Sequence, residues 1–186
     1  MSHEKEVFEA LFARIARGDA DAFERLVTLT EKQIYNTSLS ILKNREDAED
    51  VVQETYLRLW RGASSYRGGS PIAFLYTTAR NLSIDKLREC NRHPTQSEDE
   101  NALASVPDTS PTPEEYVIRK LEAETVRISL SELPDEYREI ITLRDIDGLT
   151  YDEIAQILSI PEGTVKSRLS RARDRLREIL LKKNIF

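Results

Sequence analysis

Residues 149–177 read LTYDEIAQILSIPEGTVKSRLSRARDRLR, which is two short helical patterns separated by a tight turn. Thr150, with Glu153 three residues later, forms a capping box at the start of the first pattern. Pro161 suits the first turn of the second pattern, where its missing N–H costs nothing. A short helix, a turn and a basic second helix are typical of a helix-turn-helix that reads the major groove.

The second of these helical patterns has two distinct faces. Apolar residues recur at steps of four, three and four, which predicts a buried stripe of Val165, Leu169, Ala172 and Leu176. The opposite face carries side chains suited to base edges: Lys166, Ser167, Ser170 and Arg171. Such motifs usually carry glycine where this chain has Ser159, and a left-handed serine costs roughly 1–2 kcal/mol more than glycine. The turn is therefore strained or of a different type, and a plain helical hairpin with a solvated basic face remains the alternative.

Composition limits the class of protein. Of 186 residues, 32% are charged and 39% hydrophobic, which suits a strongly helical, soluble chain. Cys90 is the single cysteine, so no intramolecular disulfide forms, and with only two histidines we expect neither a metal site nor a cofactor. No apolar run approaches the ~20 residues of a membrane span, and the N-terminus is no signal peptide. We expect a cytoplasmic protein that does not insert into membranes.

The charge is unevenly distributed along the chain. The net charge is −6, yet residues 163–186 carry 8 basic and 2 acidic side chains, while residues 93–113 carry 4 acidic and no Lys or Arg. Non-specific DNA binding is mainly neutralisation of phosphates, so an acidic protein binds DNA poorly unless something else supplies affinity. The pattern indicates a DNA reader that acts inside a larger complex.

The remaining sequence predicts an all-α fold of two small domains. Residues 93–113 break every periodicity and hold four of the seven prolines, which is typical of a flexible acidic linker. The domains are therefore 1–92 and 114–186. Asp19, Asn44 and Ser70 are the expected helix caps. Helical periodicity is expected over residues 4–17, 20–43, 45–61, 72–91, 114–133 and 134–146.

Two features of the first domain have both a structural and a functional interpretation. Residues 46–54 carry five carboxylates, which suit a solvated helix N-terminus or a docking surface for a basic partner. The loop 62–70 and the polar face of the helix after it would suit single-stranded bases or an ordinary amphipathic helix. We expect Trp60 and Phe74 to face inward. The sequence has no Gly-rich phosphate loop and no nucleophile–base pair, so an enzyme is not expected.

Three stretches together resemble one family. They are NREDAEDVVQETYLRLW at 44–60, FLYTTARNLSIDKLR at 74–88, and LPDEYREIITLR at 133–144 followed by 149–177. The chain resembles the extracytoplasmic-function (group IV) sigma factors of bacterial RNA polymerase, in the sigma-70 family, from about residue 20 to 180. The resemblance implies a non-catalytic subunit that directs polymerase to specific promoters of a stress or envelope-response regulon.

The resemblance also implies roles for particular residues. A sigma-2 domain would bind the β′ clamp helices of the polymerase core through Asp47, Asp50, Gln53, Glu54 and Arg58. It would melt the −10 element and hold its non-template single strand through Tyr66, Arg67, Gly68, Gly69, Ser70, Arg80, Asn81 and Asp85. A sigma-4 domain would dock on the β flap and set Lys166, Ser167, Ser170 and Arg171 on duplex −35 bases. Nearer the phosphates would lie Arg168, Arg173 and Arg175.

Departures from the family limit what carries over. Phe74 stands where the family often has Trp, Pro71 where it has a non-proline, and Ser170 where some relatives have an aromatic residue. The −10 and −35 sequences therefore do not transfer. The family also implies an anti-sigma partner. Two alternative functions remain. One is a DNA-binding regulator with a helical dimerisation or sensing domain, and the other is a helical adaptor whose face at 166–177 binds acidic protein.

Overall fold

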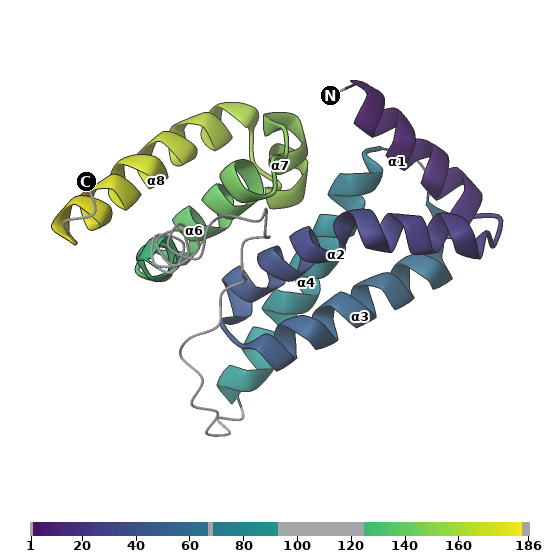
Figure 1. Ribbon diagram of the computed structural model, residues 1–186, viewed down its shortest axis with the longest axis horizontal. Coiled ribbons are helices and arrows are strands. Elements are labelled where there is room, and N and C mark those ends of the chain that lie inside the picture. Colours follow the sequence, from purple (N-terminus) through teal and green to yellow (C-terminus); the bar gives the residue numbers. More distant parts are fainter. Residues whose placement is uncertain (1, 67–68, 93–124, 184–186) are drawn as a thin grey trace, which may run out of the picture.

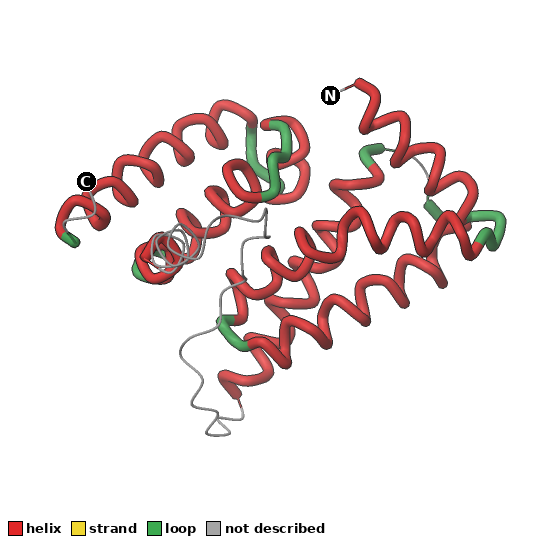
Figure 2. The backbone as a smooth tube through the Cα atoms, viewed as in Figure 1, coloured by secondary structure: helices red, strands yellow, loops and turns green. Residues whose placement is uncertain are grey.

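The computed structural model describes residues 2–66, 69–92 and 125–183, and every regular element in these ranges is helical (Figures 1 and 2). The predicted all-α fold is confirmed. The predicted linker 93–113, and residues 114–124 of the helix expected after it, lie outside the described residues. Residues 125–131 are helical. The labelled elements are α1 Ser2–Ile15, α2 Ala20–Leu42, α3 Arg45–Gly62, η1 Ala63–Ser65, α4 Pro71–Arg92, α6 Asp135–Ile141, η2 Thr142–Ile146, α7 Tyr151–Leu158 and α8 Glu162–Lys182.

The N-terminal unit is built on α2, α3 and α4, which pack against one another, while α1 covers α2 and α4. Its helices begin at the predicted caps. The Asp19 carboxylate accepts from the Ala22 amide at 3.0 Å, and the Asn44 side chain accepts from the Asp47 amide at 3.0 Å. The Ser70 hydroxyl accepts from the Ala73 amide at 3.3 Å. Each cap satisfies an amide that the first helical turn leaves without an intrahelical partner.

The core of this unit corrects two predictions about aromatic residues. Trp60 and Phe74 are 40% and 36% exposed rather than turned inward. Leu59 is fully buried on α3, and the next residue of a helix points about 100° away, because a turn takes 3.6 residues. Trp60 instead packs its ring against Phe23, with centroids 5.0 Å apart. Phe74 packs on the outer side of the unit against Phe12 at 6.4 Å.

The C-terminal unit contains the predicted helix-turn-helix in α7 and α8. The capping box is present: the Thr150 amide donates to the Glu153 carboxylate at 2.9 Å, and the Glu153 amide donates to the Thr150 hydroxyl at 3.3 Å. The expected stripe of α8 faces α6 and α7. Its members Val165, Leu169 and Ala172 are buried, and Leu176 is half-buried.

The structure refines two predicted details of this unit. Pro161 is the N-cap of α8, directly before its first helical residue, and its carbonyl oxygen accepts from the amides of Thr164 and Val165 at 2.8 and 3.1 Å. The helix expected over 134–146 extends to Ile146 as predicted, but it is α-helical only to Ile141, and its last turn is the π turn η2. The Asp147 amide closes that turn on the carbonyl of Thr142 at 2.9 Å.

The two units contact each other: α7 packs on α4, and α6 and η2 pack on α2 (Figure 1). Arg138 of α6 lies in this contact with 1% of its surface exposed. Its Nε donates to the carbonyl of Ser40 on α2 at 2.8 Å, and its Nη1 donates to the carbonyls of Ser131 and Leu133 at 3.1 and 3.0 Å. Its Nη2 binds the Asp135 carboxylate. One guanidinium therefore satisfies backbone acceptors from both units.

Replacing Ser159 with glycine should stabilise the chain. Ser159 closes α7 with φ 54° and ψ 44°, a left-handed conformation that costs serine more than glycine. After the entropy that glycine loses on folding, Ser159→Gly should raise the free energy of unfolding by roughly 0.5–1 kcal/mol. Urea unfolding measures this. Ser159→Val, which favours the left-handed region even less, should shift the midpoint the other way, and a stabilising valine would contradict the argument.

Replacing Arg138 with leucine should destabilise the chain strongly. The substitution leaves the carbonyls of Ser40, Ser131 and Leu133 buried without their donor, so we expect a loss of about 3 kcal/mol. The same change at the exposed Arg25 of α2 is the matched control and should alter the urea midpoint little. Equal effects of the two substitutions would show that the buried guanidinium is unimportant.

Candidate nucleic-acid interface

The outward face of α8 is the clearest candidate for contact with DNA. Lys166, Ser167, Ser170 and Arg171 are all exposed, as the helical spacing predicts. The Ser167 hydroxyl donates back to the Thr164 carbonyl at 3.1 Å, which leaves its oxygen directed along the helix surface as an acceptor. Within the described part of the chain, Arg171 has no ion-pair partner. Arg171 therefore presents an uncompensated guanidinium fork beside two hydroxyls, which are groups able to bind base edges.

Four other basic residues of α8 pair with carboxylates. Lys166 pairs with Glu162 at 2.6 Å, and the hydrogen bond raises the pKa of the Lys166 ammonium. Arg175 pairs with Glu178 at 2.7 Å. The partners of Arg168 and Arg173 come from the helices behind α8: Glu136 at 3.5 Å and Asp145 at 3.0 Å. Exposed pairs of this kind are weak, so phosphate can replace these carboxylates.

Tyr151, at the start of α7, connects the two helices of the motif. The guanidinium carbon of Arg144 lies 4.9 Å from the centre of its ring, and the Lys166 ammonium lies 5.7 Å from it. Both distances are within the range of cation–π attraction. The Tyr151 ring and the Glu162 carboxylate therefore both attract the Lys166 ammonium.

The predicted −10 residues of α4 do not all face the same way. Asn81 and Asp85 are exposed, and Asp85 accepts from Arg88 at 3.4 Å. Arg80 turns toward the C-terminal unit, where its Nε and Nη2 donate to the Glu139 carboxylate at 2.6 and 3.4 Å. Asn81 and Asp85 are therefore open to solvent, whereas Arg80 is already paired across the contact between the units.

The loop before α4 supplies the other predicted −10 residues, of which Arg67 and Gly68 lie outside the described residues. The Tyr66 ring packs against Phe12 and Phe74, with centroids 5.3 and 5.4 Å away, and its buried hydroxyl has no hydrogen-bond partner. Burial raises the pKa of this hydroxyl. Gly69 has φ 111°, a conformation that glycine tolerates and other residues avoid. The Ser70 hydroxyl is occupied in capping α4. This loop end is therefore structurally fixed.

The predicted polymerase-binding residues share one side of α3. Asp50, Gln53 and Arg58 are exposed, and Asp47 and Glu54 are half-buried. Glu54 accepts from Arg58 at 2.7 Å. Lys86 of α4 binds Asp47 and Asp50 at 2.9 and 2.7 Å. Burial lowers the pKa of the Lys86 ammonium, but its two carboxylate partners outweigh that effect and raise the pKa.

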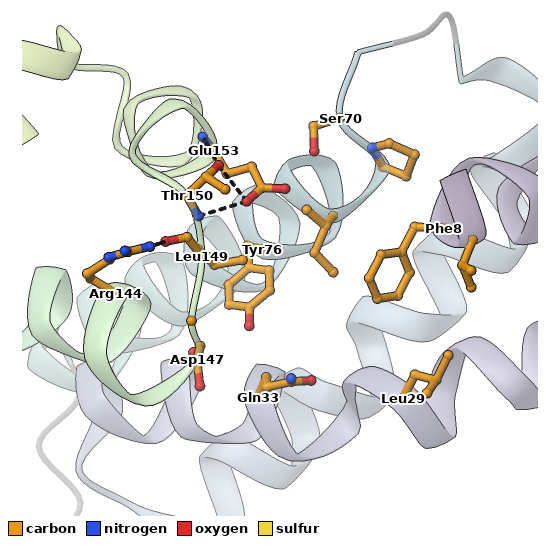
Figure 3. A pocket seen from close by; sticks show the side chains of 14 residues that line it. Phe8, Leu29, Gln33, Ser70, Tyr76, Arg144, Asp147, Leu149, Thr150 and Glu153 are labelled. Carbon is orange, nitrogen blue, oxygen red and sulfur yellow. Dashed lines mark hydrogen bonds between the residues drawn. The ribbon is translucent and has the colours of Figure 1, made fainter. Parts of the chain in front are cut away.

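A cleft of about 480 Å³ lies between the two units (Figure 3). Its walls are Phe8 of α1, Leu29 of α2 and the start of α4 on one side, and the segment from Arg144 to Glu153 on the other. Among the described residues, no group of side chains is arranged to hold a metal ion. No described helix is long and apolar enough to span a bilayer.

Comparison with known proteins identifies the family. The sigma-70 region 2 family matches residues 26–93, and the sigma-70 region 4 family matches residues 126–176. The RNA polymerase sigma-H factor of Pseudomonas aeruginosa is 30% identical, with 95% of each chain covered. The ECF RNA polymerase sigma factor SigW of Bacillus subtilis is 32% identical over 90% of this chain and 93% of its own. The chain is an ECF sigma factor of the sigma-70 family.

A solved sigma-factor structure agrees with this assignment. The sigma factor RpoE of Bartonella quintana, crystallised with the anti-sigma factor NepR, is 30% identical and superimposes with a TM-score of 0.66. The comparison covers 85% of this chain and 96% of that one. In the chain described here, the region 2 match spans most of α2 and all of α3 and α4. The region 4 match spans α6, α7 and most of α8.

The sequence did not predict the distant ion-pair partners of the candidate binding residues. Glu139 is 59 positions from Arg80, and Lys86 is 36 positions from Asp50. Asp145 lies 28 positions from Arg173. Helical periodicity detects neighbours three or four positions apart and contains no information about such distant pairs. Pairs at helical spacing, such as Glu162 with Lys166 and Glu54 with Arg58, do have a signal in the sequence.

Proposed function

We propose that this sigma factor directs RNA polymerase to specific promoters through two DNA-reading units, residues 1–92 and 114–186, joined by 93–113. The observation that carries the proposal is the exposed face of α8, where Ser167 and Ser170 lie with Arg171, which has no ion-pair partner among the described residues. This face would read the −35 bases in the major groove, with Arg168, Arg173 and Arg175 on phosphates. The rest of the unit docks on the β flap.

The N-terminal unit would bind the core enzyme and open the −10 element. The acidic side of α3, with Asp47, Asp50 and Glu54 held by Lys86 and Arg58, presents fixed carboxylates to a basic partner such as the β′ clamp helices. Asn81 and Asp85 would contact the displaced non-template strand, together with Arg80 and the loop at 66–70. Because polymerase supplies most of the affinity, the chain can carry a net charge of −6 and still act on DNA.

The wider setting follows from the same proposal. The chain has no catalytic step of its own and acts with the polymerase in the cytoplasm. The names of its relatives, which belong to the extracytoplasmic-function group, support a stress or envelope-response regulon. The RpoE structure, determined with an anti-sigma factor bound, supports a partner of that class for this chain.

Reconstituted transcription tests the proposal. The purified chain with core polymerase should produce transcripts from specific promoters of a genomic library, and neither component should do so alone. A conventional regulator would instead bind duplex promoter DNA tightly without polymerase. Absence of any promoter-specific transcript with a folded chain and active core enzyme would refute the proposal.

Replacing Asn81 with alanine should impair promoter opening selectively. Asn81 is exposed on α4, away from the acidic side of α3, so its loss should leave binding to core polymerase unchanged. We expect at least tenfold slower open-complex formation, equivalent to about 1.4 kcal/mol. Permanganate reactivity of the −10 thymines measures opening. Equal losses of polymerase binding and opening would contradict the role, and Glu89→Ala, on the same helix but outside the proposed site, serves as the control.

Replacing Arg171 with alanine should relax specificity at one base pair. A bidentate contact from its guanidinium would cost about 1–3 kcal/mol at a single −35 position and little elsewhere. Transcription from promoters with each −35 base pair substituted measures this. Arg175→Ala is the matched comparison, because a phosphate contact there should weaken all promoters alike. A uniform loss for Arg171→Ala would make it a phosphate contact as well.

A further inference from the structure

The first helix, α1, lies before the part of the chain that matches sigma-70 region 2, which begins at residue 26. It nevertheless packs against α2, α4 and η1 (Figure 1). Leu11, Phe12 and Ile15 of α1 are each at most 4% exposed. The helix is therefore part of the core of the N-terminal unit, and it touches the segment that connects α3 to α4.

Phe12 belongs to a cluster of three aromatic rings. The centre of its ring lies 5.3 Å from that of Tyr66 and 6.4 Å from that of Phe74, and the latter two centres are 5.4 Å apart. The planes of these three pairs meet at 62°, 89° and 60°, so every pair is edge-to-face. This arrangement adds an attraction between the rings to the effect of burial. Phe12 therefore restrains both of the other rings.

Tyr66 and Phe74 stand on either side of the loop that the proposed function assigns to the −10 element. The Tyr66 amide donates to the Ala63 carbonyl at 3.2 Å. The Phe74 amide donates to the Ser70 carbonyl at 3.0 Å. The Tyr66 hydroxyl lies beside Gly69, since a Cβ atom added to this glycine would be 3.7 Å from it. Backbone hydrogen bonds thus fix both ends of the loop, and a ring from α1 connects the side chains of the two ends.

The exposure of the rings differs in a way that suits a stacking surface. Phe12 is 4% exposed, whereas Phe74 is 36% exposed although two rings pack against it. Single-stranded nucleic acids bind in part by stacking their bases on aromatic side chains. An exposed phenylalanine on a helix can otherwise move between rotamers. The contacts with Phe12 and Tyr66 restrict this freedom, so the Phe74 ring is presented to solvent in a defined orientation.

We infer that Phe12 of α1 is a positioning residue of the −10 site: with Tyr66 it sets the orientation of the Phe74 ring, on which an unstacked base of the non-template strand stacks. The inference rests on the proposed function, because it concerns how this chain holds the −10 strand. Phe12 is too deeply buried to touch DNA, so it acts only through the other two rings. It lies outside the match to region 2, and its role follows from the contacts of its ring alone.

Loss of core packing is the alternative explanation for any effect of Phe12, and the choice of variants separates the two. Phe12→Leu and Phe12→Met fill much of the same space with an aliphatic side chain but remove the flat ring. Ile15→Val is the matched control, because it removes buried apolar volume from the same helix without changing a ring. Urea unfolding and binding to core polymerase show that each variant is folded.

Fluorescence of 2-aminopurine measures the stacking directly. The probe is fork-shaped DNA from a promoter that the holoenzyme transcribes, with 2-aminopurine at one non-template −10 position at a time. Stacking on an aromatic ring quenches this base. At the position that stacks on Phe74, saturating Phe12→Leu holoenzyme should give roughly twofold higher fluorescence than the parent, and it should bind the fork about fivefold more weakly. Ile15→Val should change neither measurement.

A double-mutant cycle tests whether Phe12 acts through Phe74. In a Phe74→Leu background the stacking ring is absent, so Phe12→Leu should weaken binding of the fork by less than about twofold there. Equal losses in the two backgrounds, or equal fluorescence changes for Phe12→Leu and Ile15→Val, would overturn the inference. Phe12→Met takes the place of Phe12→Leu if the latter does not fold. These outcomes leave promoter-specific transcription by the parent holoenzyme, and thus the proposed function, intact.

Discussion

The buried Arg138 guanidinium is the interaction on which the relative position of the two helical units depends. An unpaired cation in this environment would be strongly unfavourable, because burial removes its water. Arg138 remains charged because carbonyls from the end of α2 and from the turn before α6 surround it, while its partner Asp135 stays 79% exposed. The packing of α6, η2 and α7 on α2 and α4 therefore requires that the buried Arg138 guanidinium keep its hydrogen-bond acceptors.

Local chemistry explains which parts of this structure were predictable. Caps at Asp19, Asn44 and Thr150 act within three residues, so they mark helix starts correctly in sequence alone. The outward face of α8 follows from the period of its apolar stripe. The π turn after Ile141 and the exposure of Trp60 do not follow, because tertiary packing decides both. The partners of Arg80 and Arg173 are equally hidden, since they lie 59 and 28 positions away.

Compensation of charge is a common theme of the proposed interfaces. Carboxylates of the same chain pair with Arg80, Arg168 and Arg173, and Lys86 pairs with two acidic residues of α3, Asp47 and Asp50. Each side chain is thereby kept in a defined position, while the field it projects into solvent is reduced. Long-range attraction between the free chain and arbitrary DNA is correspondingly weak. A polymerase that brings the two together locally would replace this missing attraction.

The exposed position of Trp60 has a practical optical consequence. It is the single tryptophan of the chain, and it lies on α3, the helix that carries the acidic residues. An indole that is 40% exposed and rests on the Phe23 ring emits from a partly aqueous environment. Its emission wavelength and quenching by iodide therefore report what covers α3, without any added label. The same property makes intrinsic fluorescence a poor reporter of the helix-turn-helix, whose described residues contain no indole.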